Sequence, residues 1–194
     1  MIVPEIDIRD NELAKHPEQL GVVTTTYYPN WYRGELKSDE DTDKVRGDLA
    51  LTTLTKSHHL HHPTWVIDGT GENTPFWEEL HKLNINVFPQ QQKGMDSARQ
   101  EGFKLAGDDQ LVSVITWTEP EKVSFLDQAC LWTATLPVVR GTYDLVIPAR
   151  DEKGFMSYPA FQASSEKRLN ARFNKLLHIP SLLKRAFSLF SDEA

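Results

Sequence analysis

Five short runs rich in apolar, β-branched and aromatic residues alternate along this chain with segments of helical periodicity, and this alternation constrains the fold more than any other feature. The runs cover residues 21–28, 64–69, 85–90, 111–117 and 143–150. The helical patterns between them cover residues 44–56, 74–83, 95–106 and 121–134. Strands separated by helices build βαβ units with right-handed crossovers. We therefore predict an α/β fold with a mostly parallel sheet and helices on both of its faces.

The helical pattern that follows Thr74 is the clearest of the four. Threonine caps helix N-termini well, and a proline such as Pro75 suits the first helical position. The apolar stripe predicted for this helix consists of Phe76, Trp77, Leu80 and Leu83. The pattern at 44–56 is weaker, because Gly47 and several threonines lower its helix propensity.

The remaining three helices also have predicted inward faces, set by the 3.6-residue period. These are Val45, Leu49, Ala50 and Leu54 in the first; Met95, Ala98, Gly102, Leu105 and Ala106 in the second; and Val123, Leu126, Ala129, Cys130 and Ala134 in the third.

The length and composition fit one principal domain. A chain of 194 residues with 39% hydrophobic residues can bury most of its apolar surface in a single core. We divide it into an N-terminal extension at 1–20, an α/β domain at 21–162 and an amphipathic helical segment at 163–194.

Charge and cysteine usage exclude several classes of protein. The formal net charge is -7 and the basic residues form no dense run, so we expect no nucleic-acid partner. Cys130 is the single cysteine, which excludes an intramolecular disulfide, and we expect a buried thiol in a reducing compartment such as the cytoplasm. No stretch approaches the roughly 20 apolar residues of a membrane span, and we expect neither a transmembrane helix nor a signal peptide.

Polar side chains follow the predicted strands at the points where the strands end. In open α/β sheets, ligands bind outside the carboxyl ends of the strands, so these residues are the candidates for chemistry. They are Tyr27, Tyr28 and Pro29 after the first strand; Asp68, Gly69, Thr70 and Gly71 after the second; Thr118, Glu119 and Glu121 after the fourth; and Arg150 after the fifth. Their chemistry predicts a charged site for a phosphorylated ligand with a divalent metal.

Several of these motifs resemble those of GT-A fold glycosyltransferases, especially the large family that includes polyprenyl-phosphate mannosyl- and glucosyltransferases. In that family the opening strand ends in a proline at the nucleotide site, as TTTYYP does here with Pro29. The second strand carries an aspartate that contacts the base or ribose, and VIDGTGENTPF offers Asp68. The helix after the third strand follows G-x-G-x-A-x-x-x-G-x-x-x-A, which GMDSARQEGFKLA matches at Ala98, Gly102 and Ala106.

The resemblance continues along the chain to about residue 178. The family's fourth strand runs into a metal-binding Asp-x-Asp motif, and VITWTEPEK occupies that place. YDLVIPAR is similar to the family's D-[IV]-V-x-x-x-R, with Asp144 and Arg150, and SSEKRLNARFNKLL looks like its arginine-bearing helix, with Arg168. The resemblance implies a Rossmann-like nucleotide-sugar-binding domain of the GT-A type.

The resemblance also implies a reaction, namely transfer of a hexose from a nucleotide-diphosphate sugar to an acceptor that the sequence does not identify, a lipid-linked acceptor being one option. The residues it implies are Glu119 and Arg150 for catalysis; Tyr27, Pro29, Asp68, Gly69, Arg99, Thr118 and Arg168 for the nucleotide sugar; and Glu119 and Glu121 for Mg²⁺ or Mn²⁺. No catalytic base is assigned.

The chain departs from the family at the metal motif. Thr116-Trp117-Thr118-Glu119 stands where two aspartates are expected, and the family's lysine in the third loop is replaced, which leaves Lys93 or Arg99 to meet a phosphate. A single carboxylate still suffices for a hard cation when diphosphate oxygens and waters complete its shell. The alternative hypothesis is a catalytically inactive nucleotide-sugar-binding module or a partner subunit, because the chain also ends before the family's acceptor-side residues.

Structural interpretations of the same residues stay open. A carboxylate at 119 or 121 can cap the following helix, and an aspartate before glycine, as at 68, can serve a turn. Arg150 can pair with a neighbouring acid, Asp151 or Glu152. The tryptophans at 65, 117 and 132 are predicted to be core residues rather than platforms for a sugar.

Two further segments carry weaker signals. SHHLHHP places His58 and His62 four residues apart, a spacing that can bind zinc on a helix, and a His-rich metal site is the third hypothesis. Because no Glu lies between them and Pro63 follows, we predict a solvated helix end instead. The amphipathic tail at 163–194 is predicted to pack on the sheet, with peripheral contact to a membrane surface as the alternative.

Overall fold

The computed structural model describes residues 16–38, 40–146, 164, 167–168 and 171–172. These residues fall in two units, one within Asp7–Thr142 and the other within Tyr143–Ala194. The α/β fold lies in the first unit and is described by itself. The division predicted at 162/163 stays a prediction.

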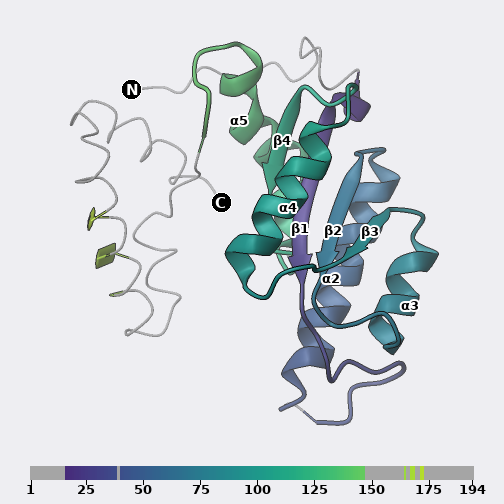
Figure 1. Cartoon of the computed structure of the whole chain (residues 1–194). Coiled ribbons are helices and arrows are strands. Elements are labelled where there is room, and N and C mark those ends of the chain that lie inside the picture. The colour runs from purple at the N-terminus through teal and green to yellow at the C-terminus, as the bar shows by residue number, and fades with distance from the viewer. Residues whose placement is uncertain (1–15, 39, 147–163, 165–166, 169–170, 173–194) are drawn as a thin grey trace. The chain divides into compact units, whose positions relative to one another are not determined.

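Four parallel strands form one sheet in the order β3-β2-β1-β4 (Figure 1). The strands are β1 Leu20–Thr26, β2 Thr64–Asp68, β3 Asn86–Pro89 and β4 Val114–Trp117. In the register, Val23 of β1 lies between Trp65 of β2 and Trp117 of β4. The predicted α/β fold with a parallel sheet is confirmed.

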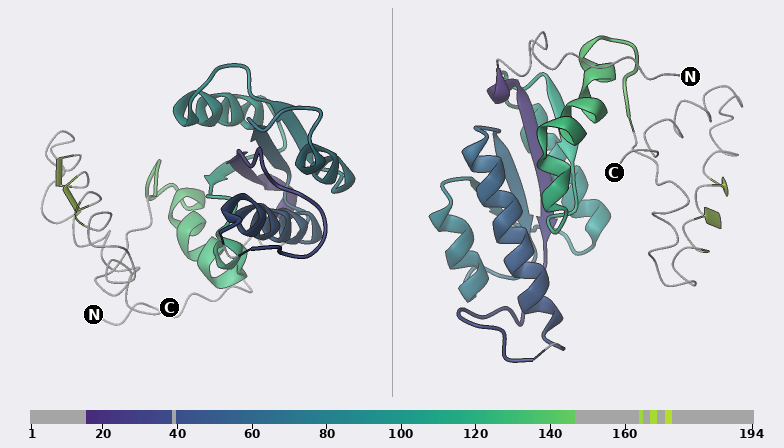
Figure 2. Two further views of the ribbon diagram at one scale, coloured as in Figure 1. Left: turned by 90° about the horizontal axis from the view of Figure 1, so that it is seen from below. Right: turned by 180° about the vertical axis from the view of Figure 1, so that it is seen from behind.

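Helices cover both faces of the sheet, as predicted. The helices are α2 Thr42–His59, α3 Pro75–Lys82, α4 Met95–Gly107 and α5 Gln128–Val139, with short 3-10 helices η2 Pro17–Gln19 and η3 Val123–Leu126. Seen along the sheet, α4 lies on one face and the other three α-helices on the opposite one (Figure 2). From β1 to β3 the chain moves across the sheet in one direction, and from β3 to β4 it crosses back in the other. Right-handed crossovers in opposite directions place their helices on opposite faces of the sheet.

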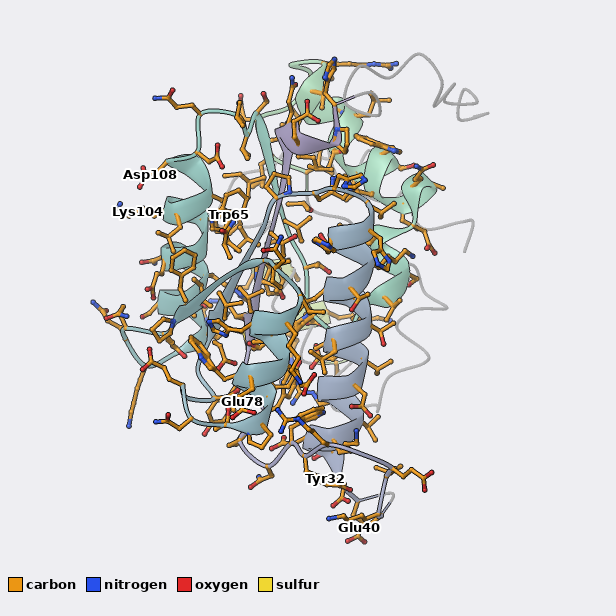
Figure 3. All side chains as sticks on the ribbon, turned by 90° about the vertical axis from the view of Figure 1, so that its right-hand side faces the viewer. Tyr32, Glu40, Trp65, Glu78, Lys104 and Asp108 are labelled. Atoms are coloured by element: carbon orange, nitrogen blue, oxygen red, sulfur yellow. The ribbon has the colours of Figure 1, made fainter. Side chains whose placement is uncertain are left out.

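Alternate residues of the strands pack into hydrophobic clusters on the two faces of the sheet. Leu20 and Val22 of β1 pack with Trp132 of α5, while Val23 packs with Trp65 and with α4 on the other face. The side chain of Trp65 is seen on the α4 side in Figure 3. Trp65 and Trp132 are 4% and 3% exposed, so the prediction that they belong to the core is confirmed.

The fifth strand predicted at 143–150 is not present in its described part. Residues 143–146 form no strand, and 147–150 lie outside the described residues. The predicted strand at 111–117 is shorter than expected and begins at Val114.

The helix predicted after Thr74 is confirmed together with its cap. The side chain of Thr74 accepts a hydrogen bond from the backbone N of Trp77 at 3.3 Å, and Pro75 is the first helical residue. Phe76 and Leu80 of its stripe are fully buried against α2 and β2.

The inward face predicted for α2 was only half right. Ala50 and Leu54 are buried, whereas Val45 and Leu49 are each 40% exposed. The helix is rotated relative to the predicted orientation because Trp31, from the loop after β1, packs against it at Gly47. A Cβ at Gly47 would come within 2.3 Å of Trp31 Cδ1. A helix of low amphipathicity is thus oriented by a side chain from outside the helix.

The helix predicted at 121–134 divides into η3 and α5. Asp127 has an extended backbone between them, with φ −64° and ψ 135°, and this break shifts the helical phase. As a result Leu126 is buried as predicted, but Cys130 is exposed and Ala129 with it. The prediction of a buried thiol was therefore wrong.

The inward face of α4 was predicted at its small residues. Ala98, Gly102 and Ala106 are buried, but Met95 is 61% exposed because it lies at the helix start, beyond the sheet, and Leu105 is half-buried.

The histidines after α2 do not form a helical pair. The helix ends at His59, and His62 lies beyond it, buried and in edge-to-face contact with Trp132. Its Nδ1 donates to the carbonyl oxygen of Pro17 at 3.0 Å. Among the described residues, no group of three or more His, Cys, Asp or Glu is placed to hold a metal ion.

We expect His62 to make the fold sensitive to acid. Burial lowers the pKa of His62 below its ordinary 6.5. The unfolded chain therefore binds a proton more readily than the folded chain, and the free energy of unfolding falls as pH drops below about 6.5, by up to about 1.4 kcal/mol per pH unit. The variant His62→Gln should lose less stability between about pH 7.5 and about pH 5.5 in urea unfolding. The exposed His59→Gln serves as the control, and equal losses in both variants would contradict the assignment.

Candidate functional site

The carboxyl ends of β1, β2 and β4 meet at one edge of the sheet (Figure 1). The chain passes from β1 to β2 and β3 on one side, and then returns to β4 on the other side of β1. The reversal makes the β1/β4 boundary the topological switch point, where open α/β sheets bind their ligands. The predicted residues Asp68, Thr118 and Glu119 therefore lie at the ends of the strands that flank β1 on its two sides.

Asp68 ends β2 and is 1% exposed. Its Oδ1 accepts hydrogen bonds from the hydroxyls of Thr26 at 2.6 Å and Thr70 at 2.8 Å. Its Oδ2 accepts from the backbone N of Thr70 at 3.1 Å and of Gly71 at 3.3 Å. Burial raises the pKa of Asp68 in spite of these donors. The carboxylate thus holds the turn after β2, which is the structural role considered for it, and its nucleotide contact stays a prediction.

The exposed surface at this edge includes Tyr27. Its side chain is 63% exposed, and its ring lies beside Gly69, where a Cβ would come within 3.3 Å of Tyr27 Cδ2 and 2.5 Å of Gln90 Oε1. The backbone N of Gly69 donates a hydrogen bond to the carbonyl oxygen of Thr26 at 2.9 Å. Pro29, which was predicted to lie at the nucleotide site, is exposed. Tyr27 and Gly69, which follow the neighbouring strands β1 and β2, are therefore brought together.

Thr118 and Glu119 leave β4 directly beside β1. The backbone N of Thr118 bonds to the carbonyl oxygen of Val23 at 3.2 Å, and the hydroxyl of Thr24 donates to the carbonyl oxygen of Thr118 at 2.8 Å. Glu119 is different, because its side chain is 52% exposed and its contact with the Lys122 ammonium is long, at 3.6 Å. Glu119 is thus a carboxylate at the switch point that is open to a ligand.

Glu121 is engaged with protein partners. Its Oε1 accepts a hydrogen bond from the Tyr28 hydroxyl at 2.8 Å and from Arg46 Nε at 2.7 Å. Arg46 Nη2 lies 2.6 Å from the same oxygen. Neither Glu119 nor Glu121 caps a helix, since Lys122 precedes η3 and Asp127 precedes α5.

Arg99 approaches the site from α4. Its guanidinium carbon lies 4.0 Å from the centroid of the Trp117 ring, at the end of β4, and its side chain is 34% exposed. Its Nη1 is 3.7 Å from Asp96, and its Nε and Trp117 Nε1 have no hydrogen-bond partner among the described residues. The guanidinium of Arg99 therefore lies over the indole ring of Trp117, close to the switch point.

Two predicted residues are not placed relative to this edge. Arg150 lies outside the described residues. Arg168 belongs to the other unit, is exposed, and its Nε donates to the carbonyl oxygen of Ser164 at 3.3 Å.

Sequence reasoning missed Arg46, Thr26 and the role of Tyr28. Arg46 lies on a weakly amphipathic helix and contacts a residue 75 positions away, so no local pattern indicates the contact. Thr26 resembles any strand threonine until Asp68 is placed beside it by the register.

A divalent cation fits this edge only through one open carboxylate. Glu119 is half exposed and has one long contact, from its Oε2 to the Lys122 ammonium at 3.6 Å, whereas Oε1 of Glu121 is occupied by three donor atoms. Mg²⁺ is commonly held by one or two carboxylates together with substrate phosphates. Glu119 is accordingly the residue that would hold the ion with a diphosphate ligand.

Comparison with known protein families, curated proteins and solved structures finds no match. Within the part of the chain that the structure describes, no helix is long and apolar enough to cross a membrane.

Proposed function

We propose that this chain binds a nucleotide-diphosphate sugar at the carboxyl edge of its sheet and transfers the hexose to an acceptor, as a glycosyltransferase with a GT-A type domain. The observation that carries the proposal is the open carboxylate of Glu119 at the β1/β4 switch point, with the exposed ring of Tyr27 following the adjacent strand. A planar base matches an aromatic surface, and a cation-bound diphosphate matches an exposed carboxylate.

The chemistry gives these residues distinct tasks. Transfer breaks the bond between the anomeric carbon and a diphosphate oxygen, and the acceptor oxygen forms the new bond to that carbon. The diphosphate leaves with the electron pair, so negative charge grows on its oxygens. A divalent cation supplies charge neutralisation there when it is bound, and Glu119 would hold it. Arg99 is one described cation that can add to this stabilisation, and Arg150 and Arg168 stay predictions.

The test is calorimetric titration with UDP- and GDP-sugars, with and without Mn²⁺. We expect binding that Mn²⁺ strengthens, accompanied by slow hydrolysis of the sugar. The variant Glu119→Gln should weaken Mn²⁺-dependent binding by about tenfold or more, which is about 1.4 kcal/mol, and leave Mn²⁺-independent binding unchanged.

Asp109→Asn provides a matched control, because it also exchanges a carboxylate for its amide and Asp109 lies beyond the C-terminal end of α4, away from this edge. Unchanged Mn²⁺ dependence in Glu119→Gln would remove Glu119 from the site. Absence of any nucleotide-sugar binding by the parent protein would end the proposal.

A binding module without transfer activity is the second candidate. The observation that favours it is the single open carboxylate, since the described residues hold no group of three potential metal ligands. Nucleotide-sugar binding with no hydrolysis or transfer in the same titrations would select this candidate.

A further inference from the structure

Residues 119–122 form a β-turn that separates two glutamates. The backbone N of Lys122 bonds to the carbonyl oxygen of Glu119 at 3.0 Å, which places Pro120 and Glu121 at the two central positions. Proline at the first central position favours such a turn because its φ is already fixed near the required value. The turn sends the two carboxylates to different surroundings. The Glu121 side chain is 16% exposed, against 52% for that of Glu119.

Glu121 ties this turn to two other elements. One hydrogen bond to Glu121 comes from the hydroxyl of Tyr28, just after β1. The other comes from the guanidinium of Arg46, in the second turn of α2. The guanidinium carbon of Arg46 also lies 5.3 Å from the centroid of the Tyr28 ring. The β1 exit, the β4 exit and α2 therefore converge on one carboxylate oxygen.

The two groups that donate hydrogen bonds to Glu121 keep their protons at physiological pH. Tyr28 is 1% exposed, and burial, followed by the nearby charge of Glu121, raises the pKa of its hydroxyl, which therefore stays a donor at physiological pH. Arginine stays charged throughout this range. Arg46 balances the charge of Glu121, and Oε1 of Glu121 already accepts hydrogen bonds from Tyr28 and Arg46. Glu121 is therefore a poorer ligand for a divalent cation than Glu119.

We propose that Tyr28, Arg46 and Glu121 form a latch that fixes the 119–122 turn, and that Tyr28 and Arg46 are positioning residues that present Glu119 at the switch point. Glu121 then anchors the turn and is not a metal ligand. The latch itself follows from the contacts, while its effect on ligand binding rests on the proposed function.

Hydrogen exchange at the Lys122 amide tests the latch without any ligand. In Tyr28→Phe and in Arg46→Met we expect this amide to exchange faster by about tenfold, because its hydrogen bond closes the turn that the latch holds. Arg46→Lys keeps the charge and should restore much of the protection. The control is Arg33→Met, which removes an arginine paired with Glu78 and Glu79 on α3. Unchanged exchange in both latch variants would overturn the proposal.

Titration with UDP and Mn²⁺ tests the consequence. Arg46→Met should weaken Mn²⁺-dependent UDP binding by about fivefold, with rescue in Arg46→Lys and no change without Mn²⁺. Glu121→Gln should keep Mn²⁺-dependent affinity within about threefold, whereas Glu119→Gln loses it. If Glu121→Gln loses this affinity as fully as Glu119→Gln with normal exchange at Lys122, Glu121 is a ligand and the proposal is wrong. If the parent protein does not bind UDP with Mn²⁺, the proposed function fails, and the exchange experiment still decides the latch.

Discussion

Replacing Asp68 with alanine is expected to lower the free energy of unfolding by about 3 kcal/mol or more, because it removes a buried acceptor of four hydrogen bonds. The hydroxyl of Thr26, 4% exposed, loses its acceptor, and the backbone N–H groups of Thr70 and Gly71 lose theirs. Urea unfolding measures the loss.

The control for Asp68→Ala is Asp68→Asn, which keeps an oxygen for the two backbone donors. Its amide nitrogen must face hydroxyls that donate in the parent protein, so a cost of about 1 kcal/mol is expected. Equal stability of the alanine and asparagine variants would show that the carboxylate does not hold the turn.

The asparagine variant also carries a pH signature. Because burial raises the pKa of Asp68 above its ordinary 3.8, the folded chain holds this proton more tightly than the unfolded chain. The contribution of Asp68 to the free energy of unfolding therefore falls as pH rises through the window that begins near 3.8. Asp68→Asn does not titrate, so its stability relative to the parent protein should improve between about pH 3.5 and about pH 7. A difference that does not change with pH would contradict the raised pKa.

The strands of the sheet could be predicted because their signals are local. Parallel strands covered on both faces appear as short apolar β-branched runs, and residues 21–28 and 64–69 have this character. The edge shared by Asp68 and Glu119 then follows from topology alone, since parallel strands end together. This is why the sequence identified Asp68, Thr118 and Glu119 as candidates at the carboxyl ends of the strands.

The partners of these residues could not be predicted because they depend on how helices rotate. Arg46 reaches Glu121 only in the orientation that α2 adopts, and Trp31 sets that orientation by packing on Gly47. A periodicity argument instead favoured Val45 and Leu49, whose side chains are exposed. The orientation of a weakly amphipathic helix is decided by contacts from elsewhere in the chain, which no window of its own sequence contains.

Replacing Gly102 with alanine is expected to lower the free energy of unfolding by about 2 kcal/mol, even though alanine favours helices by about 1 kcal/mol over glycine. A Cβ at this position would lie 2.6 Å from Val23 Cγ1 and 3.3 Å from Ile67 Cγ1. Both neighbours are fully buried in the two central strands, so they cannot move aside without disturbing the sheet. Thermal and urea unfolding measure the effect.

Gly107→Ala, on the same helix, is the matched control for Gly102→Ala. A Cβ there would lie 3.9 Å from Ile115 Cδ1, an ordinary contact, and the variant should be as stable as the parent or up to about 1 kcal/mol more stable. Equal effects of the two substitutions would show that α4 does not approach the sheet this closely. The close approach also bears on the site, because Arg99 precedes Gly102 by less than one helical turn and stacks on Trp117 at 4.0 Å. A helix pushed outward at Gly102 would carry the guanidinium away from the indole, so the small residue that packs α4 also sets the position of the arginine proposed to face the diphosphate.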